Sequence, residues 1–236
     1  MANSEVIASG VDRVSGPVGG WSLVFALWGV AVALAVSVLA GAGSEYSGTW
    51  LNLKLTARWS FLIFLAVYVA RPAHQLWRTT FTKQLLARRR HLGIAFALAH
   101  YTHLTLIVYL FTLAAPGSMP MMSTGQPMAL VVPIGGSLAY VLLTAMVVTS
   151  FNAPKDWMRR IHPKAWKTLH RVGIHYFMFI YTLDWIEGLA IKTPWWFYAP
   201  FLLASLAAIV VRAQAFRSTR RSAVDAQALS VLQLRG

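Results

Sequence analysis

The chain has 236 residues, of which 57% are hydrophobic and only 12% are charged, and its mean hydropathy is +0.57. A soluble domain of this length usually carries about 25% charged residues, so the composition excludes an ordinary water-soluble protein. Cysteine is absent, which excludes disulfides, thiolate metal sites and cysteine nucleophiles. The net charge of +14 indicates nucleic-acid binding only if the basic residues form one surface, so their positions decide its meaning.

The apolar residues occur in long blocks, each near the roughly 20 residues that cross a hydrocarbon core. We therefore predict an all-α fold, a polytopic membrane bundle of about six transmembrane helices. Lys54 and Arg58 interrupt the start of the second block, and its helix is compatible with continuing through Pro72 toward Trp77. The predicted spans are Ser22–Ala42, Leu51–Ala70, Leu92–Ala114, Met128–Phe151, Val172–Ile191 and Trp195–Val211.

Basic residues cluster in alternate connections between these blocks. Of the 21 lysines and arginines, 18 precede the first block, follow the sixth, or lie in the second and fourth connections, which leaves Lys54, Arg58 and Lys192 for the other side. The positive-inside rule then places both termini in the cytoplasm and the protein in the inner (plasma) membrane. This topology accounts for the charge, so we predict membrane lipid as a partner and no nucleic acid.

A single membrane domain accounts for most of the chain. We expect a cytoplasmic segment over residues 1–21, the transmembrane domain over 22–215 and a cytoplasmic tail over 216–236. The tail is predicted to be solvated, with an amphipathic helix on anionic lipid as the alternative. Pro116–Pro127 is predicted as an outer loop. No dinucleotide fingerprint or phosphate loop occurs, so a flavin or nicotinamide must belong to another protein, or the donor must be a quinol.

Five of the seven histidines lie at or inside the membrane boundary of the third and fifth spans. Ionisable groups inside a span are costly and are candidates for a functional site. A hydrogen bond to a neighbouring helix explains any one of them, but five on two spans favour a cofactor. Haem iron takes axial imidazoles from two facing helices, and neutral imidazole adds no charge to an apolar core. The candidates are His91, His100, His103, His170 and His175, whereas His74 and His162 lie in basic loops.

Helical geometry separates these candidates. At about 100° per residue, His100 and His103 share one face of the third span, and His91 points away from His100. His170 and His175 differ by about 140°, so both cannot face the same iron. His91 and His170 lie at the cytoplasmic boundary, whereas His103 lies about 18 Å beyond His91. Small residues expected to leave room for a macrocycle are Gly93, Ala95, Ala97, Ala99 and Gly173.

Aromatic and acidic residues gather near the outer end of the fifth span. The aromatic residues lie at the depth expected for an interface belt. The two acids are interpreted as capping the interface, with a cation site or a proton relay to an acceptor as the alternative. The aromatic residues are Trp185, Trp195, Trp196 and Tyr198, and the acids are Asp184 and Glu187.

Three stretches of the chain resemble the ferric-reductase-like transmembrane superfamily. Span two opens with Thr56-Ala57-Arg58-Trp59, similar to the family's TGRxA start. Span three reads Arg89-Arg90-His91-Leu92-Gly93-Ile94, with His103 ten residues after Gly93, where the family places a haem ligand. Span five opens with Trp166-Lys167-Thr168-Leu169-His170-Arg171, similar to the family's WxxLH ligand motif. The superfamily includes the haem-binding membrane subunit of the bacterial methionine sulfoxide reductase system, six-transmembrane metalloreductases and NADPH oxidases.

The resemblance extends over roughly residues 50–215 and implies a ferric-reductase-like transmembrane domain. It places His103 and His170 first as iron ligands, and we rank His100 and His175 after them and His91 last, on its depth alone. The family's second span-five histidine falls at Leu183, so we expect one haem b rather than two. The pairing stays open between a rearranged histidine pair and a non-histidine ligand such as Met178, for which ordinary packing is the alternative.

The functional hypothesis is a membrane b-type cytochrome that transfers electrons from a cytoplasmic flavoprotein or quinol to an outer-face acceptor. It would be the haem-bearing component of an oxidoreductase system, without a flavin domain or catalytic residues of its own. Basic connections such as Arg88–Arg90 with Arg159–Lys167 suit an acidic flavoprotein, although topology alone explains them as well. The alternative is a non-redox transporter or assembly factor whose histidines are structural or form a proton path.

Overall fold

The computed structural model describes residues 19–41, 46–109, 112, 128–191 and 195–233. The described residues contain helices and no strand, which confirms the predicted all-α fold. The predicted outer loop Pro116–Pro127 lies outside them. The helices are α1 (Gly20–Gly41), α2 (Tyr46–Leu76), α3 (Thr80–Ala87), α4 (Arg89–Tyr109), α5 (Met128–Val148), α6 (Asn152–Ile161), α7 (Pro163–Ile191), the 3₁₀ turn η2 (Trp195–Phe197) and α8 (Ala199–Gln233).

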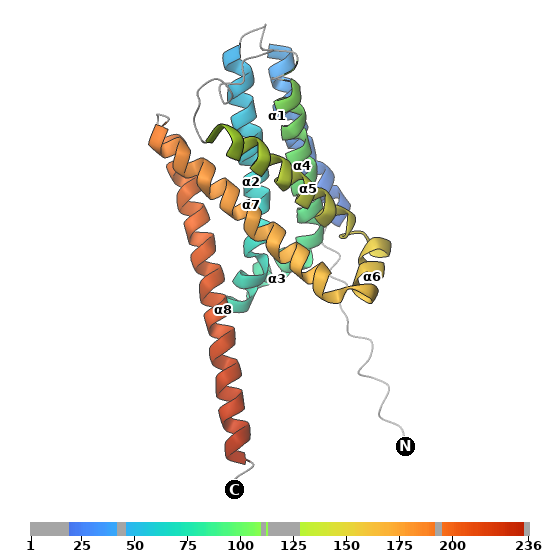
Figure 1. Cartoon of the computed structure of the whole chain (residues 1–236), viewed down its shortest axis with the longest axis vertical. Helices are drawn as coiled ribbons and strands as arrows, with labels where there is room; N and C mark the ends of the chain where they lie inside the picture. Colours follow the sequence, from blue (N-terminus) through green and yellow to red (C-terminus); the bar gives the residue numbers. More distant parts are fainter. Residues whose placement is uncertain (1–18, 42–45, 110–111, 113–127, 192–194, 234–236) are drawn as a thin grey trace.

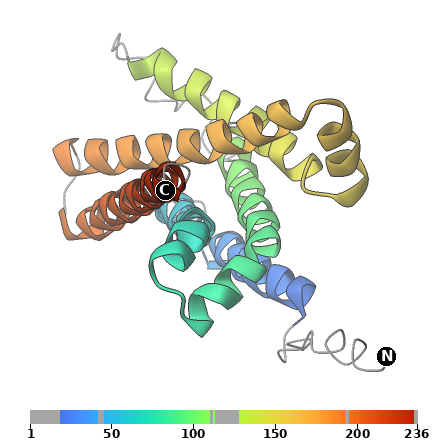
Figure 2. The same ribbon diagram turned by 90° about the horizontal axis from the view of Figure 1, so that it is seen from below.

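Helix α2 is the centre of the bundle, because it packs against α1, α3, α4 and α8. Helices α1, α2, α4 and α8 run close to the long axis, whereas α5 and α7 are strongly inclined to it (Figures 1 and 2). The inclined pair joins the rest through contacts of α5 with α4 and of α7 with α8. The core therefore lies where α7 crosses α2 and α4, and its largest fully buried side chains include Phe61, Phe64, Phe177 and Trp185.

Four helices are long and apolar enough to cross a membrane, and they carry the predicted first, second, third and sixth spans. A fifth crossing is obtained if α5 and α6, which meet at an angle of 96°, are counted as one broken span. The predicted span Val172–Ile191 on α7 is not among these helices, because His175, Asp184 and Glu187 lower its hydropathy. The described chain thus has four or five candidate spans, compared with six predicted.

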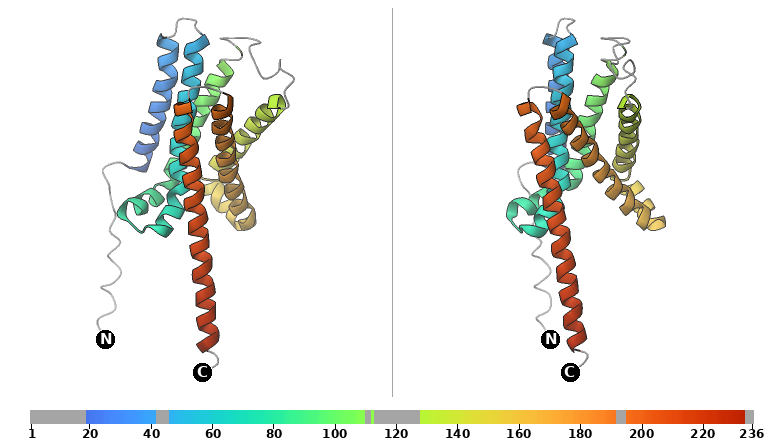
Figure 3. Two further views of the ribbon diagram at one scale, coloured as in Figure 1. Left: turned by 90° about the vertical axis from the view of Figure 1, so that its left-hand side faces the viewer. Right: turned by 60° about the vertical axis from the view of Figure 1, so that its left-hand side comes forward.

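One end of the bundle collects the basic connections. Helices α3 and α6 lie at this end, and the second half of α8 projects beyond it (Figures 1 and 3). We call it the basic end, since it carries Lys83, Arg88, Arg160 and Arg217. Helix α8 is continuous for 35 residues, or about 52 Å at 1.5 Å per residue. The predicted cytoplasmic tail is therefore helical through Gln233.

Proline 72 lies inside α2, which runs on through Arg71 and Pro72 to Leu76. Proline has no N–H, so the Tyr68 carbonyl, four residues earlier, receives no helical hydrogen bond from it. Arg212 of α8 supplies the missing donor, because its Nη1 donates to this carbonyl at 3.2 Å. Its guanidinium carbon also lies 4.6 Å from the centre of the Tyr68 ring. The proline thus creates a docking point for α8 on α2.

Candidate histidine site

A stripe of four buried side chains on α2 organises the region around the histidines. Thr56, Ser60, Phe64 and Tyr68 follow one another at intervals of four residues, and each is at most 2% exposed. Residues at this spacing lie on the same side of a helix. Three of the four carry hydroxyl groups, so the α2 stripe offers hydrogen-bond partners inside an otherwise apolar bundle.

The first hydroxyl of the α2 stripe holds His103 of α4. The Thr56 hydroxyl donates its only hydrogen to the Leu53 carbonyl at 3.1 Å. Its Oγ1 lies 3.0 Å from His103 Nδ1, and which of the two atoms donates depends on the tautomer of the ring. When the hydroxyl keeps its hydrogen on Leu53, Nδ1 donates to Thr56 and Nε2 of the neutral ring has a lone pair. This is the tautomer that a metal-binding imidazole adopts when its other nitrogen is tied down.

The second hydroxyl of the stripe belongs to a triangle with His100 and Tyr181. The Ser60 hydroxyl donates to the Ala57 carbonyl at 2.9 Å and lies 2.9 Å from the Tyr181 hydroxyl. His100 Nδ1 lies 3.3 Å from both hydroxyl oxygens. If Tyr181 donates to Ser60 over the shorter distance, both hydroxyl hydrogens are used and Nδ1 must donate its own. His100 then has the same tautomer as His103.

Aromatic rings enclose His100 from three helices. The Tyr140 ring of α5 stacks on it at 5.0 Å between centroids, and Phe96 of α4 stacks at 5.4 Å. Phe177 of α7 meets it edge-on at 5.6 Å. His103 stacks beside it at 5.6 Å, which agrees with the two sharing one face of α4. His100 is only 9% exposed, so its ring is buried among these side chains.

The two histidines of α7 lie elsewhere. His170 Nδ1 donates to the Trp166 carbonyl of its own helix at 3.1 Å, and the Trp166 ring lies 4.9 Å from its ring. His175 is exposed, and its Nδ1 lies 3.5 Å from the hydroxyl of Tyr68 at the end of the α2 stripe. Each α7 histidine is therefore nearer the basic end than His100.

His91 packs against the start of α1. Its ring meets the Trp21 ring edge-on at 5.7 Å. A Cβ atom on Gly20 would overlap the His91 ring, so this position of α1 has room only for glycine while the imidazole lies there. Trp21 and Gly20 thus hold His91 at the α1–α4 contact, away from α7.

Phe177 and Tyr181 occupy the part of α7 that faces His100. His170 lies seven residues before Phe177, or about 10 Å along the helix. His175 is two residues from Phe177, which places it about 160° around the helix. Within the described residues, no hydrogen bond or ring contact joins a histidine of α4 to a histidine of α7.

The space expected beside small residues is partly filled. A Cβ atom at Gly173 would overlap Met146 Sδ, so α5 uses this gap. A Cβ atom at Gly93 would meet nothing within 4 Å, so that position is open. A cavity of about 420 Å³ lies between α1 and α4, lined by Trp28, Leu98, Thr102 and Tyr109 among others. It borders the face of α4 opposite His100 and His103.

Arg58 explains why two residues of the predicted aromatic belt are buried. Its guanidinium donates to the Lys54 and Phe197 carbonyls and lies 3.6 Å from the Phe197 ring centre. Trp185 and Tyr198 cover the same charge from 5.4 and 5.2 Å and are 1% and 4% exposed. Aromatic faces stabilise a cation that is removed from water. Trp195 and Trp196, at 68% and 61% exposed, keep the outward orientation that a belt requires.

The other residues singled out from the sequence take ordinary positions. Met178 is 2% exposed and belongs to the core, as packing predicts. Asp184 is close enough to Arg58 to interact with its charge. His74, predicted in a basic loop, lies instead in the last turn of α2, where its Nδ1 is 3.2 Å from the Thr82 hydroxyl. His162 is exposed at the end of α6.

The partners of the histidines were not identified from the sequence. Thr56, Ser60 and Tyr68 lie on a predicted span, and their four-residue spacing was a signal that they share one side. Tyr140 and Tyr181 could not be found this way, because the contact depends on how α5 and α7 cross α4. The proposed ligands therefore belong to a wider network than histidine spacing indicates.

Comparisons of the chain with protein-family models, with curated proteins and with solved structures give no match. Among the described residues, no group of three or more histidine, cysteine, aspartate or glutamate side chains is arranged to hold a metal ion. A haem needs fewer protein ligands, because the porphyrin supplies four nitrogens to the iron. The donor chemistry of His100 and His103 fits an axial ligand, whereas the α7 residues facing His100 are Phe177 and Tyr181.

Proposed function

We propose that the protein is a membrane b-type cytochrome with one haem b, transferring electrons from a cytoplasmic flavoprotein or quinol to an acceptor at the outer face. The observation that carries this proposal is the state of the two α4 imidazoles. Both have Nδ1 within 3.3 Å of a hydroxyl of the α2 stripe, and the tautomer with the proton on Nδ1 leaves Nε2 of each ring available as a ligand. A bound haem supplies one-electron chemistry through its iron.

The residues of the chain have separate tasks in this proposal. His103 or His100 provides the α4 ligand, and the resemblance gives His170, followed by His175, as the α7 ligand. Thr56 and Ser60 fix the orientation of the α4 rings through Nδ1. Tyr140, Phe96 and Phe177 exclude water from His100, and a dry surrounding keeps the imidazole neutral and available.

The proposed topology has six crossings and both termini in the cytoplasm of a cell bounded by the inner membrane. The grouping of α3, α6 and the second half of α8 at the basic end supports it, since the positive-inside rule assigns that end to the cytoplasm. Helices α5 and α7 supply the fourth and fifth crossings. The electron donor then docks at the basic end, where Arg88 and Arg90 attract an acidic flavoprotein.

An absorption spectrum tests the proposal. Protein purified in detergent from haem-replete cells is expected to be red, with a Soret band that shifts on reduction by dithionite. His170→Ala is expected to lose most of the haem, and the exposed His162→Ala is the matched control. Unchanged haem content in H170A would reject that ligand while leaving the fold intact. A colourless protein that is folded and haem-exposed would reject the cytochrome proposal.

A proton path is the second candidate, and one observation favours it. The hydroxyls of Ser60 and Tyr181 and the His100 imidazole form a hydrogen-bonded group inside the bundle, and the His103 ring stacks on His100. Such networks relay protons in membrane transporters. Colourless protein reconstituted into vesicles would then acidify or alkalinise the lumen along an ion gradient, and Tyr181→Phe would stop this flux. A bound haem with no flux supports the cytochrome.

A further inference from the structure

Helix α6 separates its apolar and polar residues by face. Pro154, Trp157, Met158 and Ile161 recur at intervals of three and four residues, which places them on one side. No residue of α6 is buried, and Trp157 and Ile161 are 64% and 49% exposed. The described part of the bundle therefore leaves Trp157 and Ile161 of this apolar face uncovered.

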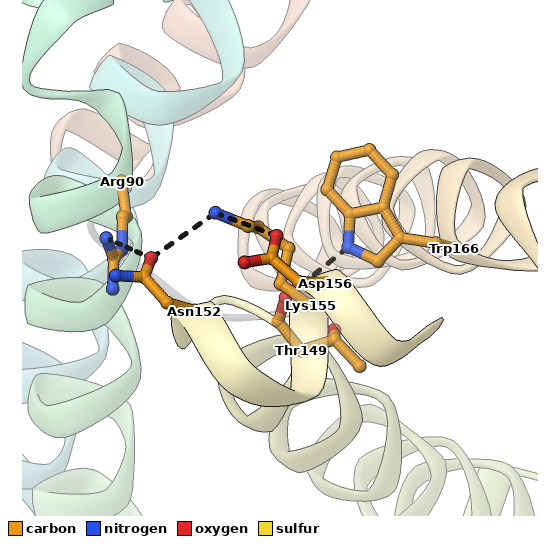
Figure 4. A network of polar contacts seen from close by, with 6 residues as sticks. All are labelled: Arg90, Thr149, Asn152, Lys155, Asp156 and Trp166. Atoms are coloured by element: carbon orange, nitrogen blue, oxygen red, sulfur yellow. Dashed lines mark hydrogen bonds and ion pairs between the residues drawn. The ribbon is translucent and has the colours of Figure 1, made fainter. Parts of the chain in front are cut away.

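The position of α6 is fixed by polar contacts at its start (Figure 4). Arg90 Nη1 of α4 donates to Asn152 Oδ1 at 3.1 Å, and Lys155 Nζ donates to the same oxygen at 3.3 Å. Trp166 Nε1 of α7 donates to the Thr149 carbonyl at 3.3 Å, just before α6 begins. Helix α6 is thus tethered to both α4 and α7. These contacts fix the direction in which the exposed face of α6 points.

Two further features support this arrangement. Helix α6 turns away from α5 by 96°, so it lies across the direction of α5. The Arg159 guanidinium carbon lies 5.5 Å from the centre of the Trp166 ring, which adds a contact to α7. A short helix turned across its span at the end of a bundle has the geometry of an interfacial helix.

The charge on α6 indicates what covers its apolar face. The polar side carries Lys155, Arg159 and Arg160, and its one acid, Asp156, lies 3.6 Å from Lys155. Helix α3 at the same end adds exposed aromatic surface at Phe81, which is 70% exposed. Bulky apolar residues beside several cations match a layer of acyl chains topped by negative headgroups. An acidic protein surface would satisfy the cations but not Trp157 and Ile161.

We propose that α6 is an interfacial helix that binds anionic phospholipid at the basic end of the bundle. Trp157 and Ile161 enter the boundary between headgroups and acyl chains. Arg160 and Lys155 contact lipid phosphates. This assignment depends on the bundle crossing a membrane and not on the presence of haem.

Site-directed spin labelling tests the depth of α6, and the cysteine-free chain requires no background substitutions. Full-length Trp157→Cys and Asp156→Cys are labelled with a nitroxide in nanodiscs of phosphatidylcholine containing one quarter phosphatidylglycerol. The label at position 157 is expected to collide more with oxygen than with a water-soluble nickel chelate, and the label at 156 the reverse. Equal exposure of both labels to the nickel chelate would overturn the proposal. Protection of position 157 from both reagents would also overturn it, because that result indicates a protein partner.

Retention of bound lipid tests whether the basic residues of α6 bind anionic headgroups. Native mass spectrometry of protein released from the same nanodiscs is expected to show phosphatidylglycerol retained over phosphatidylcholine. Arg160→Gln is expected to lower this preference about fivefold, as for one basic residue near an anionic surface. Lys54→Gln is the matched control, since Lys54 lies near the start of α2 and α3 at the basic end follows the other end of that helix, and it should retain the wild-type preference. Equal losses in R160Q and K54Q, or no loss in R160Q, would overturn the role of Arg160.

Discussion

The Nδ1 atom of His103 on α4 lies 3.0 Å from the Oγ1 atom of Thr56 on α2, 47 positions earlier in the chain. Thr56 also lies within hydrogen-bond distance of the Leu53 carbonyl, and when its hydrogen is used there, the imidazole donates and the hydroxyl accepts. The contact restrains the tilt of the ring and favours the tautomer with the proton on Nδ1.

Replacing Thr56 by valine is expected to release His103. Valine has nearly the same shape but no acceptor, so the imidazole can rotate or change tautomer. Loss of such an outer partner typically weakens metal binding about 10- to 100-fold. Haem titration followed at the Soret band measures the effect, and Thr56→Ser keeps the acceptor as a control. Equal haem affinity in T56V and wild type would show that His103 is not a ligand oriented by Thr56.

The Ser60–Tyr181 hydrogen bond is expected to couple α2 to α7. Ser60→Ala and Tyr181→Phe should each destabilise the fold, and the double variant should lose less than the sum, by about 0.5–1.5 kcal/mol. Unfolding in detergent, followed by tryptophan fluorescence, gives the coupling energy. Tyr176→Phe is the control, because the Tyr176 hydroxyl donates to the Gly135 carbonyl instead. Additive effects of S60A and Y181F would mean that the hydroxyl contact contributes little.

The docking of α8 is expected to depend on Pro72. Arg212→Leu leaves the Tyr68 carbonyl without a donor and should cost about 1–3 kcal/mol. In a Pro72→Ala background, residue 72 regains an N–H that can bond to the Tyr68 carbonyl, so the same substitution should cost less. Thermal unfolding midpoints of the four proteins measure the difference. If R212L costs the same in both backgrounds, the carbonyl is not what Arg212 satisfies.

Gly188 is expected to tolerate no side chain. A Cβ atom there would overlap the ring of Tyr198, which is 4% exposed and packed against Phe197 at 5.5 Å. Gly188→Ala should therefore cost about 1–3 kcal/mol, as overpacking does. Gly29→Ala is the matched control, since a Cβ there meets nothing within 4 Å, and it should stabilise its helix by up to about 1 kcal/mol. Equal thermal midpoints for G188A and G29A would contradict the assigned close packing.

Periodicity predicted the helices and the shared face of His100 and His103, because both depend on residues near in sequence. It did not predict that Phe177 and Tyr181 of α7 face His100. That arrangement depends on the inclination of α7, which is set by packing against α5 and α8. The distances between candidate ligands on different helices could therefore not be predicted from the sequence.

The outer end of α7 shows a related limit. Trp185 near a span end has the pattern of an interface tryptophan. In the fold it is fully buried, because Arg58 brings a cation into the bundle that aromatic rings must cover. Arg58 inside an apolar block was visible in the sequence, but the identity of its neighbours required the fold of η2 and α8 onto α2.

The four-residue repeat of the α2 stripe has one more consequence. An α-helix has 3.6 residues per turn, so each step of four advances the direction of the side chain by about 40°. From Thr56 to Tyr68 the stripe winds through about 120°, turning from α4 toward α7 and α8. Helix α2 therefore contacts His103 and His100 through Thr56 and Ser60, and contacts His175 and Arg212 through Tyr68. A one-residue insertion between Ser60 and Phe64 would rotate the part of α2 that carries Phe64 and Tyr68 by about 100° relative to the part that carries Thr56 and Ser60. The contacts with His103 and His100 could then no longer form together with the contacts to His175 and Arg212.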